Sequence, residues 1–421
     1  MTQSQLHSTD SIKERVILVG LDTGETDINS CLDELKQLVE TANAEQAGRL
    51  IQKREHINPG FYLGTGKLEE LKALVAEKNA TGIVCDDELS PAQLRNMEEA
   101  LECKIMDRTM VILDIFAARA MSSEGKIQVE LAQLKYRLTR LTGLGTSLSR
   151  LGGGIGTRGP GEKKLEVDRR YIKDRISELK GELEEIRTHR SLLRTQRKKG
   201  GTPVVSLVGY TNAGKSTILN GITNAGVLEE DKLFATLDTT TRIAALPNGS
   251  KILLTDTVGF IQKLSHHLIE AFKATLEELQ YADILIHVVD ASDPLISEHM
   301  KVVYDTLKSL GCEGKPVITV FNKMDKTQDV VLAEDKMCRS SLCICAKNHD
   351  DLERLLESIE SVLKMFRHME KILIPYSKGS LLSLIYGKCE IATEQHTPEG
   401  TLIEAYISPE LSERLKEYII E

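Results

Sequence analysis

The chain has 421 residues, of which 41% are hydrophobic and 28% charged, and this composition excludes a wholly disordered protein. Aromatic residues make up only 4% and tryptophan is absent, which disfavours a stacking platform for single-stranded nucleic acid. The net charge of −9 is unevenly distributed, because residues 126–200 hold 19 lysines and arginines against 9 acids, a pattern typical of an arm that meets a polyanion.

The sequence contains no run of eighteen apolar residues and no leader pattern at its N-terminus. We therefore expect no stable membrane insertion and a cytoplasmic location, with peripheral attachment to a membrane as the alternative. We also expect a monomer. The eight cysteines form no C-x-x-C pair, so we expect free thiols.

The first predicted domain, residues 1–105, alternates short β-branched runs with helical ones. Residues 16–19 and 81–85 are typical of buried strands, and Ser90 followed by proline is a strong helix start. This alternation predicts a small parallel α/β domain. Residues 64–67 resemble part of a phosphate loop, but they lack its first glycine and its final hydroxyl, so we favour a turn before a helix and keep an ATP site as the alternative.

Residues 106–199 are predicted to form an antiparallel helical hairpin. Leucine and isoleucine recur every three or four residues on both sides of a break, as in a coiled-coil seam. The break, residues 142–161, holds eight glycines together with Arg150 and Arg158. A glycine-rich chain lets the backbone approach RNA closely, and both arginines are candidate phosphate contacts. A plain flexible linker is the alternative.

Residues 200–366 contain four apolar runs, at 204–209, 253–256, 284–290 and 317–322, mostly separated by helical stretches. This arrangement predicts a doubly wound α/β sheet. Residues 367–421 follow a strand, helix, hairpin, helix order, with a turn at 397–400, and predict a small α+β domain.

The strongest motif is G-x-x-x-x-G-K-[ST], placed between an apolar strand and a helix. It comprises Gly209, Tyr210, Thr211, Asn212, Ala213, Gly214, Lys215 and Ser216, with Thr217 following. Its glycines let successive N–H groups point at the β-phosphate of a nucleotide. Lys215 adds a positive charge for the β- and γ-phosphates, and the Ser216 hydroxyl is a candidate Mg²⁺ ligand. The motif predicts a P-loop.

Two further motifs end apolar strands. The first comprises Asp256, Thr257, Val258 and Gly259; its aspartate is a candidate Mg²⁺ partner, and its glycine N–H can meet the γ-phosphate. The second comprises Asn322, Lys323, Met324 and Asp325. A carboxylate at Asp325 can accept two hydrogen bonds from guanine, whereas adenine offers no such donor pair. The later residues Cys345, Ala346 and Lys347 can present the Ala346 N–H to the guanine carbonyl.

Together these motifs resemble a translation-factor-type GTPase, and three other segments narrow the resemblance to the HflX family of ribosome-associated GTPases. These segments are residues 58–67, the glycine-rich run 148–162, and residues 234–242. The similarity extends from about residue 14 to residue 366. It departs from the usual pattern at Cys345, where most such GTPases carry serine, and we expect little loss because the ligand there is a backbone N–H.

The resemblance implies binding to the large ribosomal subunit and its RNA, with a role in splitting, rescuing or assembling ribosomes. It also implies that a loop that orders on GTP comprises Phe234, Ala235, Thr236, Leu237 and Asp238, with Thr236 as a Mg²⁺ ligand. The residues alone do not choose Thr236 over Thr239, Thr240 or Thr241. The catalytic set is then Lys215, Thr236 and Gly259.

Phenylalanine stands at position 260, where Ras-like enzymes use glutamine to orient the attacking water. We therefore expect slow hydrolysis that the ribosome stimulates. Asn212 is similar to the asparagine that ligates K⁺ in potassium-activated GTPases, with stabilisation of the loop as the equal alternative. The alternative functions are a nucleotide-gated regulator of a non-ribosomal partner and an ATP-dependent RNA remodeller that acts through the N-terminal domain.

Overall fold

The computed structural model describes residues 13–24, 26–142, 160–200, 202–223, 226, 232–263, 268, 276–327, 334–365, 368–407 and 409–420. Arg150, Arg158 and residues 143–159 of the glycine-rich loop lie outside this set. By its contacts the chain divides into two compact units. The first holds residues up to Glu184, Lys232–Phe234 and a segment that begins at Gln262; the second holds the rest.

The first unit begins with a four-stranded parallel sheet, in the order β2-β1-β3-β4. Its elements are β1 (Arg15–Asp22), α1 (Ile28–Thr41), β2 (Glu45–Lys53), α2 (Thr65–Lys78), β3 (Gly82–Cys85), α3 (Pro91–Leu101), β4 (Lys104–Asp107) and α4 (Arg108–Arg119). β1 is almost wholly buried, as its unbroken apolar run predicts. The predicted parallel α/β arrangement is therefore confirmed.

The helix starts of this unit follow local sequence signals. Ser90 and Gln93 form a capping box at the start of α3, which confirms the start predicted there. Asp107 caps α4 by accepting a hydrogen bond from the Met110 N–H at 2.9 Å. Residues 64–67 form the turn and first residues of α2, where Lys67 pairs with Glu70 at 2.8 Å. This geometry matches the predicted turn before a helix.

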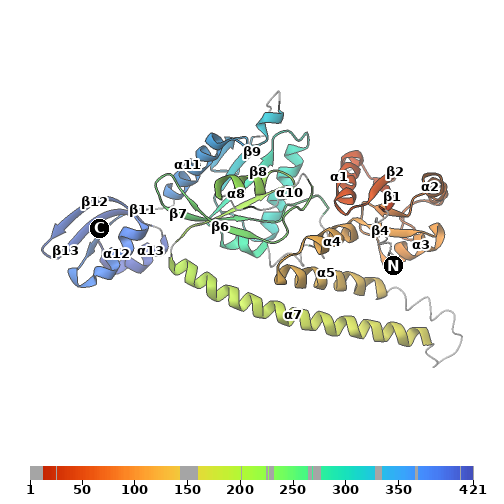
Figure 1. Ribbon diagram of the computed structural model, residues 1–421, viewed down its shortest axis with the longest axis horizontal. Coiled ribbons are helices and arrows are strands. Elements are labelled where there is room, and N and C mark those ends of the chain that lie inside the picture. Colours follow the sequence, from red (N-terminus) through yellow and green to blue (C-terminus); the bar gives the residue numbers. More distant parts are fainter. Residues whose placement is uncertain are drawn as a thin grey trace, which may run out of the picture. The chain divides into compact units, whose positions relative to one another are not determined.

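Helices α5 (Ser123–Thr142) and α7 (Pro160–Gly200) form the hairpin arm, and α5 lies beside part of α7 (Figure 1). Their seam is apolar and uses residues of the predicted repeat: Ile127, Leu131, Leu134, Leu138, Ile172, Ile176, Leu179 and Leu183. Arg175 of α7 also pairs with Glu130 of α5 at 2.8 Å. The predicted helical hairpin is confirmed by this packing.

The second unit contains a six-stranded sheet in the order β10-β9-β8-β5-β7-β6, parallel except for the antiparallel edge strand β6. Its elements are β5 (Val204–Gly209), α8 (Lys215–Thr223), β6 (Thr240–Ala245), β7 (Lys251–Asp256), η1 (Glu277–Tyr281), β8 (Ile284–Asp290), α10 (Ile296–Ser309), β9 (Val317–Asn322), η2 (Met324–Lys326), β10 (Ser340–Cys343) and α11 (His349–Met365). In such sheets, ligands bind beyond the carboxyl ends of the strands, where β5, β7 and β9 deliver the three predicted motifs.

The C-terminal part is an antiparallel sheet in the order β12-β13-β11-β14, with helices packed on its apolar face. Its elements are β11 (His368–Ile374), η3 (Tyr376–Lys378), α12 (Gly379–Lys388), β12 (Glu390–Thr397), β13 (Gly400–Ile407), α13 (Pro409–Leu415), η4 (Lys416–Tyr418) and β14 (Ile419–Ile420). Thr397 pairs with Gly400 across the predicted hairpin turn. This confirms the α+β prediction, and β14 is an added strand.

Candidate functional site

The loop between β5 and α8 folds back around its own lysine. Lys215 is buried, and its Nζ donates to the backbone carbonyls of Gly209 at 3.1 Å and Tyr210 at 2.7 Å. Burial lowers the pKa of Lys215 to about 8, and the nearby Asp256 carboxylate opposes this shift. An anionic phosphate in the loop would therefore favour the charged form of this lysine.

Gly214 adopts a left-handed backbone that only glycine accepts readily, with φ +97°. A Cβ at this position would lie 2.2 Å from Nδ2 of Asn322. Asn322 in turn donates from this Nδ2 to the Ala213 carbonyl at 2.8 Å. The second glycine of the motif is therefore required by both the conformation and the close approach of the asparagine.

Three oxygen-bearing side chains meet beside the lysine. Ser216 Oγ lies 2.7 Å from Thr236 Oγ1 and donates to Asp256 Oδ2 at 2.7 Å, and Thr236 Oγ1 donates to the same carboxylate oxygen at 3.2 Å. Burial raises the pKa of Asp256, while the charge of Lys215 lowers it. Oδ1 of Asp256 is buried and lacks a hydrogen-bond partner among the described residues. Hydroxyl and carboxylate oxygens are the ligands that Mg²⁺ prefers, so this set fits that ion.

The structure also separates Thr236 from its threonine neighbours, which the sequence alone could not do. Thr240 begins β6, and Thr241 Oγ1 lies 3.0 Å from Thr255 Oγ1 across the β6–β7 pair. Thr236 is thus the threonine whose hydroxyl lies beside Ser216 and Asp256.

The segment after β7 lies directly against the phosphate loop. A Cβ at Gly259 would lie 3.0 Å from Nζ of Lys215, so the glycine backbone lies beside the lysine. The Phe260 N–H donates to the Gly209 carbonyl at 3.1 Å, and its carbonyl accepts from the Thr211 N–H at 2.8 Å. Phe260 itself is 1% exposed. No polar side chain therefore occupies the position after Gly259.

Asn322 joins the phosphate loop to the motif around Ala346. Besides its bond to the phosphate loop, it accepts the Ala346 N–H on Oδ1 at 2.9 Å. This N–H is the one we expected to meet the guanine carbonyl, so in this structure that donor is engaged within the protein. Lys323 pairs with Asp290 at 2.8 Å, which holds its stem at the end of β9.

Cys345 has a role that the sequence did not indicate. Its Sγ donates to Oδ1 of Asp325 at 3.3 Å, and its N–H donates to Asp351 at 2.8 Å. The expectation that only the backbone matters at this position therefore missed a side-chain contact. The signal that could have revealed it is the serine usual at this position, which is also a donor to the carboxylate.

Several predicted site residues direct their side chains elsewhere. The Tyr210 ring stacks on His299 with centroids 3.7 Å apart, and the Thr257 hydroxyl donates to the Leu207 carbonyl at 2.7 Å. Phe234 packs edge-to-face on Phe116, with centroids 4.7 Å apart, within the first unit. The side chains of Leu237 and Val258 are also buried. Apart from the half-buried Tyr210, these residues have buried side chains, which leaves their backbone available to a nucleotide.

A GTPase HflX from Lacrimispora saccharolytica is 55% identical to the chain over 409 residues, covering 97% of both proteins. The chain belongs to the HflX family of GTPases. An HflX relative from Caldanaerobacter subterraneus subsp. tengcongensis is 50% identical over 408 residues, covering 97% of this chain and 94% of the relative. The expected family, P-loop fold and GTP-hydrolysing activity are thus confirmed.

Three family models match successive parts of this HflX chain. They describe a GTP-binding GTPase N-terminal region at residues 29–117, a GTP-binding GTPase middle region at 119–197, and a 50S ribosome-binding GTPase at 204–323. A solved GTP-binding protein from Sulfolobus solfataricus in complex with GDP is 26% identical, with a TM-score of 0.43, over 83% of this chain and 98% of that one.

The remaining expectations concern membranes and thiols. Among the helices that the structure describes, none has both the length and the apolar character needed to cross a bilayer. All eight cysteines are free, as expected. Within the described ranges, no cluster of three or more histidine, cysteine or acidic side chains is placed to hold a metal ion.

Proposed function

We propose that the protein binds GTP with Mg²⁺ at residues 209–216 and uses the GTP-bound state to act on the large ribosomal subunit, in splitting, rescue or biogenesis. The observation that carries the proposal is the convergence of Ser216, Thr236 and Asp256 beside Lys215. Mg²⁺ bound there would neutralise charge on the β- and γ-phosphates. Lys215 and the backbone N–H groups of the loop and of Gly259 would bind the phosphate oxygens.

Base recognition follows from Asp325. Its carboxylate can accept from the ring N–H and the exocyclic amine of guanine, and the Cys345 thiol holds one of its oxygens. Lys323, fixed by Asp290, would lie along the base plane. Met324 and Lys347 complete the two base-side motifs. These contacts favour GTP and GDP over adenine nucleotides.

Hydrolysis by the isolated protein is proposed to be slow. The buried Phe260 cannot orient water, and a partner must supply or order the missing group. The ribosome is the proposed partner, since the matched GTPase region is described as ribosome-binding and the arm is basic. Arg150 and Arg158 stay predicted RNA contacts, and binding through them should weaken as salt rises.

The ATP alternative is disfavoured by the side chains that occupy the end of the N-terminal sheet. The carboxyl ends of β3 and β4 carry Asp86, Asp87 and Asp107, at the edge of a parallel sheet where a nucleotide would bind. These carboxylates pair with Arg108, Arg140 and Lys263, so side chains of the protein itself occupy this edge. Lys67, the lysine of the phosphate-loop-like fragment, pairs with Glu70.

Two experiments test the proposal. Sedimentation with isolated large subunits should pellet the protein with a non-hydrolysable GTP analogue but not with GDP; equal pelleting, or none, contradicts it. GTP turnover should rise when large subunits are added, and equal rates would remove the proposed stimulation. Lys215→Ala should abolish GTP turnover, whereas Lys67→Ala should leave it unchanged; ATP turnover that depends on Lys67 would support the alternative.

The role of Asn212 remains a choice between two proposals. Its φ of +59° is a left-handed conformation that asparagine tolerates better than most residues, which favours stabilisation of the turn. Ligation of K⁺ is the other proposal. Turnover measured in potassium and in sodium buffers separates them, because only a K⁺ site produces a difference.

A further inference from the structure

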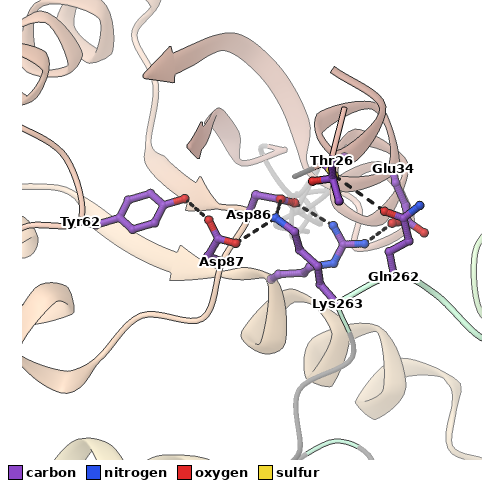
Figure 2. Close-up of polar contacts among 9 residues, drawn as sticks. Thr26, Glu34, Tyr62, Asp86, Asp87, Gln262 and Lys263 are labelled. Atoms are coloured by element: carbon purple, nitrogen blue, oxygen red, sulfur yellow. Dashed lines mark hydrogen bonds and ion pairs between the residues drawn. The ribbon is translucent and has the colours of Figure 1, made fainter. Parts of the chain in front are cut away.

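Lys263, four residues after Gly259, is held by two carboxylates of the N-terminal sheet. Its Nζ lies 2.5 Å from Oδ2 of Asp86 and 2.9 Å from Oδ1 of Asp87, both in the segment after β3. Figure 2 shows Lys263 between these two aspartates, with Tyr62 on the other side of Asp87. The Tyr62 hydroxyl donates to Asp87 at 2.6 Å. We call Lys263, Asp86 and Asp87 the clamp.

The clamp is built into a buried network. Asp86 is fully buried and also pairs with the buried Arg108 at 2.8 Å, and Arg108 pairs in turn with Glu34 of α1. Burial alone would lower the pKa of Lys263, but the two aspartates raise it above its ordinary value. The lysine therefore stays charged in this environment. It is the second positive partner, after Arg108, of the buried Asp86 carboxylate.

A second contact holds the segment before Thr236, which we expect to order on GTP, against the same unit. Phe234, two residues before Thr236, packs on Phe116 of α4, the helix that also provides Arg108. Phe234 and Lys263 both have left-handed backbones, with φ of +55° and +51°. Such conformations are uncommon for residues with a side chain, and they persist where the surroundings hold them.

The clamp coexists with a closed arrangement at the phosphate loop. In the same structure, Thr236 Oγ1 lies at hydrogen-bond distance from Ser216 Oγ, 2.7 Å, so the two hydroxyls of the proposed Mg²⁺ set lie together. We propose that Asp86 and Asp87 are positioning residues that hold the segment after Gly259 through Lys263 in its GTP-bound arrangement, and that this clamp opens with GDP. The inference rests on the proposed nucleotide site and adds a contact that depends on whether GTP or GDP occupies that site.

Because coupling between two sites is reciprocal, the state of the clamp should change the affinity for GTP relative to that for GDP. Anything that pulls Asp86 and Asp87 away from Lys263 should weaken GTP relative to GDP. Conversely, loss of the γ-phosphate should release the acidic edge of the N-terminal sheet. Residues 259–263 thus connect the clamp to the proposed nucleotide site through a short stretch of chain.

The test uses equilibrium titration of the full chain with a fluorescent non-hydrolysable GTP analogue and with fluorescent GDP. Lys263→Met keeps the stem of the side chain and removes its charge. We expect this variant to lose affinity for the GTP analogue by about tenfold, within the usual range of coupling strengths, with GDP affinity unchanged within about twofold. Asp87→Asn, which retains an acceptor for Tyr62, should act in the same direction, and Lys263→Arg should restore the wild-type ratio.

The matched control is Lys308→Met, which removes an exposed lysine that pairs with Glu313 at 3.4 Å. It should leave both affinities unchanged. An unchanged ratio of GTP to GDP affinity in Lys263→Met, or an equal loss for both nucleotides, overturns the clamp. If the wild type binds neither guanine nucleotide, the proposed nucleotide site fails, so the two failures are distinguishable.

Discussion

The Sγ atom of Cys345 lies 3.3 Å from Oδ1 of Asp325, so a thiol supports the carboxylate that we assign to guanine recognition. Cys345 follows β10, and Asp325 lies in η2 after β9, so the contact joins the last two base-side motifs. A thiol is a weaker hydrogen-bond donor than a hydroxyl. The position of Asp325 therefore depends on a contact that a stronger donor could improve.

The affinity for GDP should depend on a hydrogen-bond donor at position 345. Cys345→Ala removes the donor and should weaken GDP binding by about threefold, the effect of one modest hydrogen bond. Cys345→Ser should bind as tightly as the wild type or more tightly. Titration with fluorescent GDP measures both, with Cys103→Ala as the control thiol in the other unit. Wild-type affinity in Cys345→Ala would show that the contact does not support the base site.

A methyl group at Gly214 should block nucleotide binding, because it would lie 2.2 Å from Nδ2 of Asn322. We expect Gly214→Ala to lose nucleotide affinity by a factor on the order of 100, since two motifs must separate to admit it. Gly311→Ala is the matched control, because Gly311 also has a positive φ, of +69°, but nothing lies within 4 Å of its Cβ position. Calorimetric titration distinguishes them, and similar losses in both variants would contradict the steric argument.

Loss of the Ser216 hydroxyl should remove the effect of Mg²⁺ on GTP binding. In the wild type, EDTA should weaken binding of a GTP analogue, because Ser216, Thr236 and Asp256 are proposed to hold the ion. Ser216→Ala should bind the analogue about tenfold more weakly with Mg²⁺ present and show no further loss with EDTA. Ser216→Thr, which keeps a hydroxyl, should respond to EDTA as the wild type does. A full Mg²⁺ effect in Ser216→Ala would exclude this ligand.

Acid should destabilise the protein through His287 on β8. Burial lowers the pKa of this histidine to about 4 from 6.5, with Asp335 opposing the shift and Lys215 adding to it. Between pH 6.5 and 4 the unfolded chain therefore binds a proton that the folded chain does not, so stability falls as pH falls. Its contribution over this window is about 3 kcal/mol.

Urea unfolding of the wild type and of His287→Gln at pH 7 and pH 5 measures this contribution. Subtracting the pH effect in the variant removes that of the other groups. The wild type should lose more stability on acidification than the variant does. An equal loss in the two proteins would show that His287 titrates normally in the fold.

Unbroken apolar runs made the central strands predictable. Residues 284–290 are predicted as a strand with the bounds that β8 has, because all of them except His287 and Asp290 are apolar, and every residue before the last is buried. β2 was not predicted, since residues 45–53 mix polar side chains with a glycine and gain their strand structure from pairing with β1. β6 was missed for the same reason, as an edge strand whose residues are mostly exposed or half-buried.

The candidate site likewise contains residues that local sequence patterns predict and others that they do not. Fixed motifs predicted Lys215, Asp256 and Asp325 as site residues, because their chemistry is local to a few consecutive residues. The choice of Thr236 required tertiary structure, since four threonines within six residues were equivalent in sequence. The clamp joins residues 177 positions apart, such as Lys263 and Asp86, and no local pattern reports such a pair.

The most direct test of the account is calorimetric titration of the purified full chain with GDP and with ADP in the presence of Mg²⁺. Asp325 should accept from guanine and find no matching donors on adenine, so GDP should bind more tightly by a factor on the order of 100 or more. Asp325→Asn should remove most of this preference. Equal affinities for the two nucleotides in the wild type, or tighter binding of ADP, would contradict the central claim.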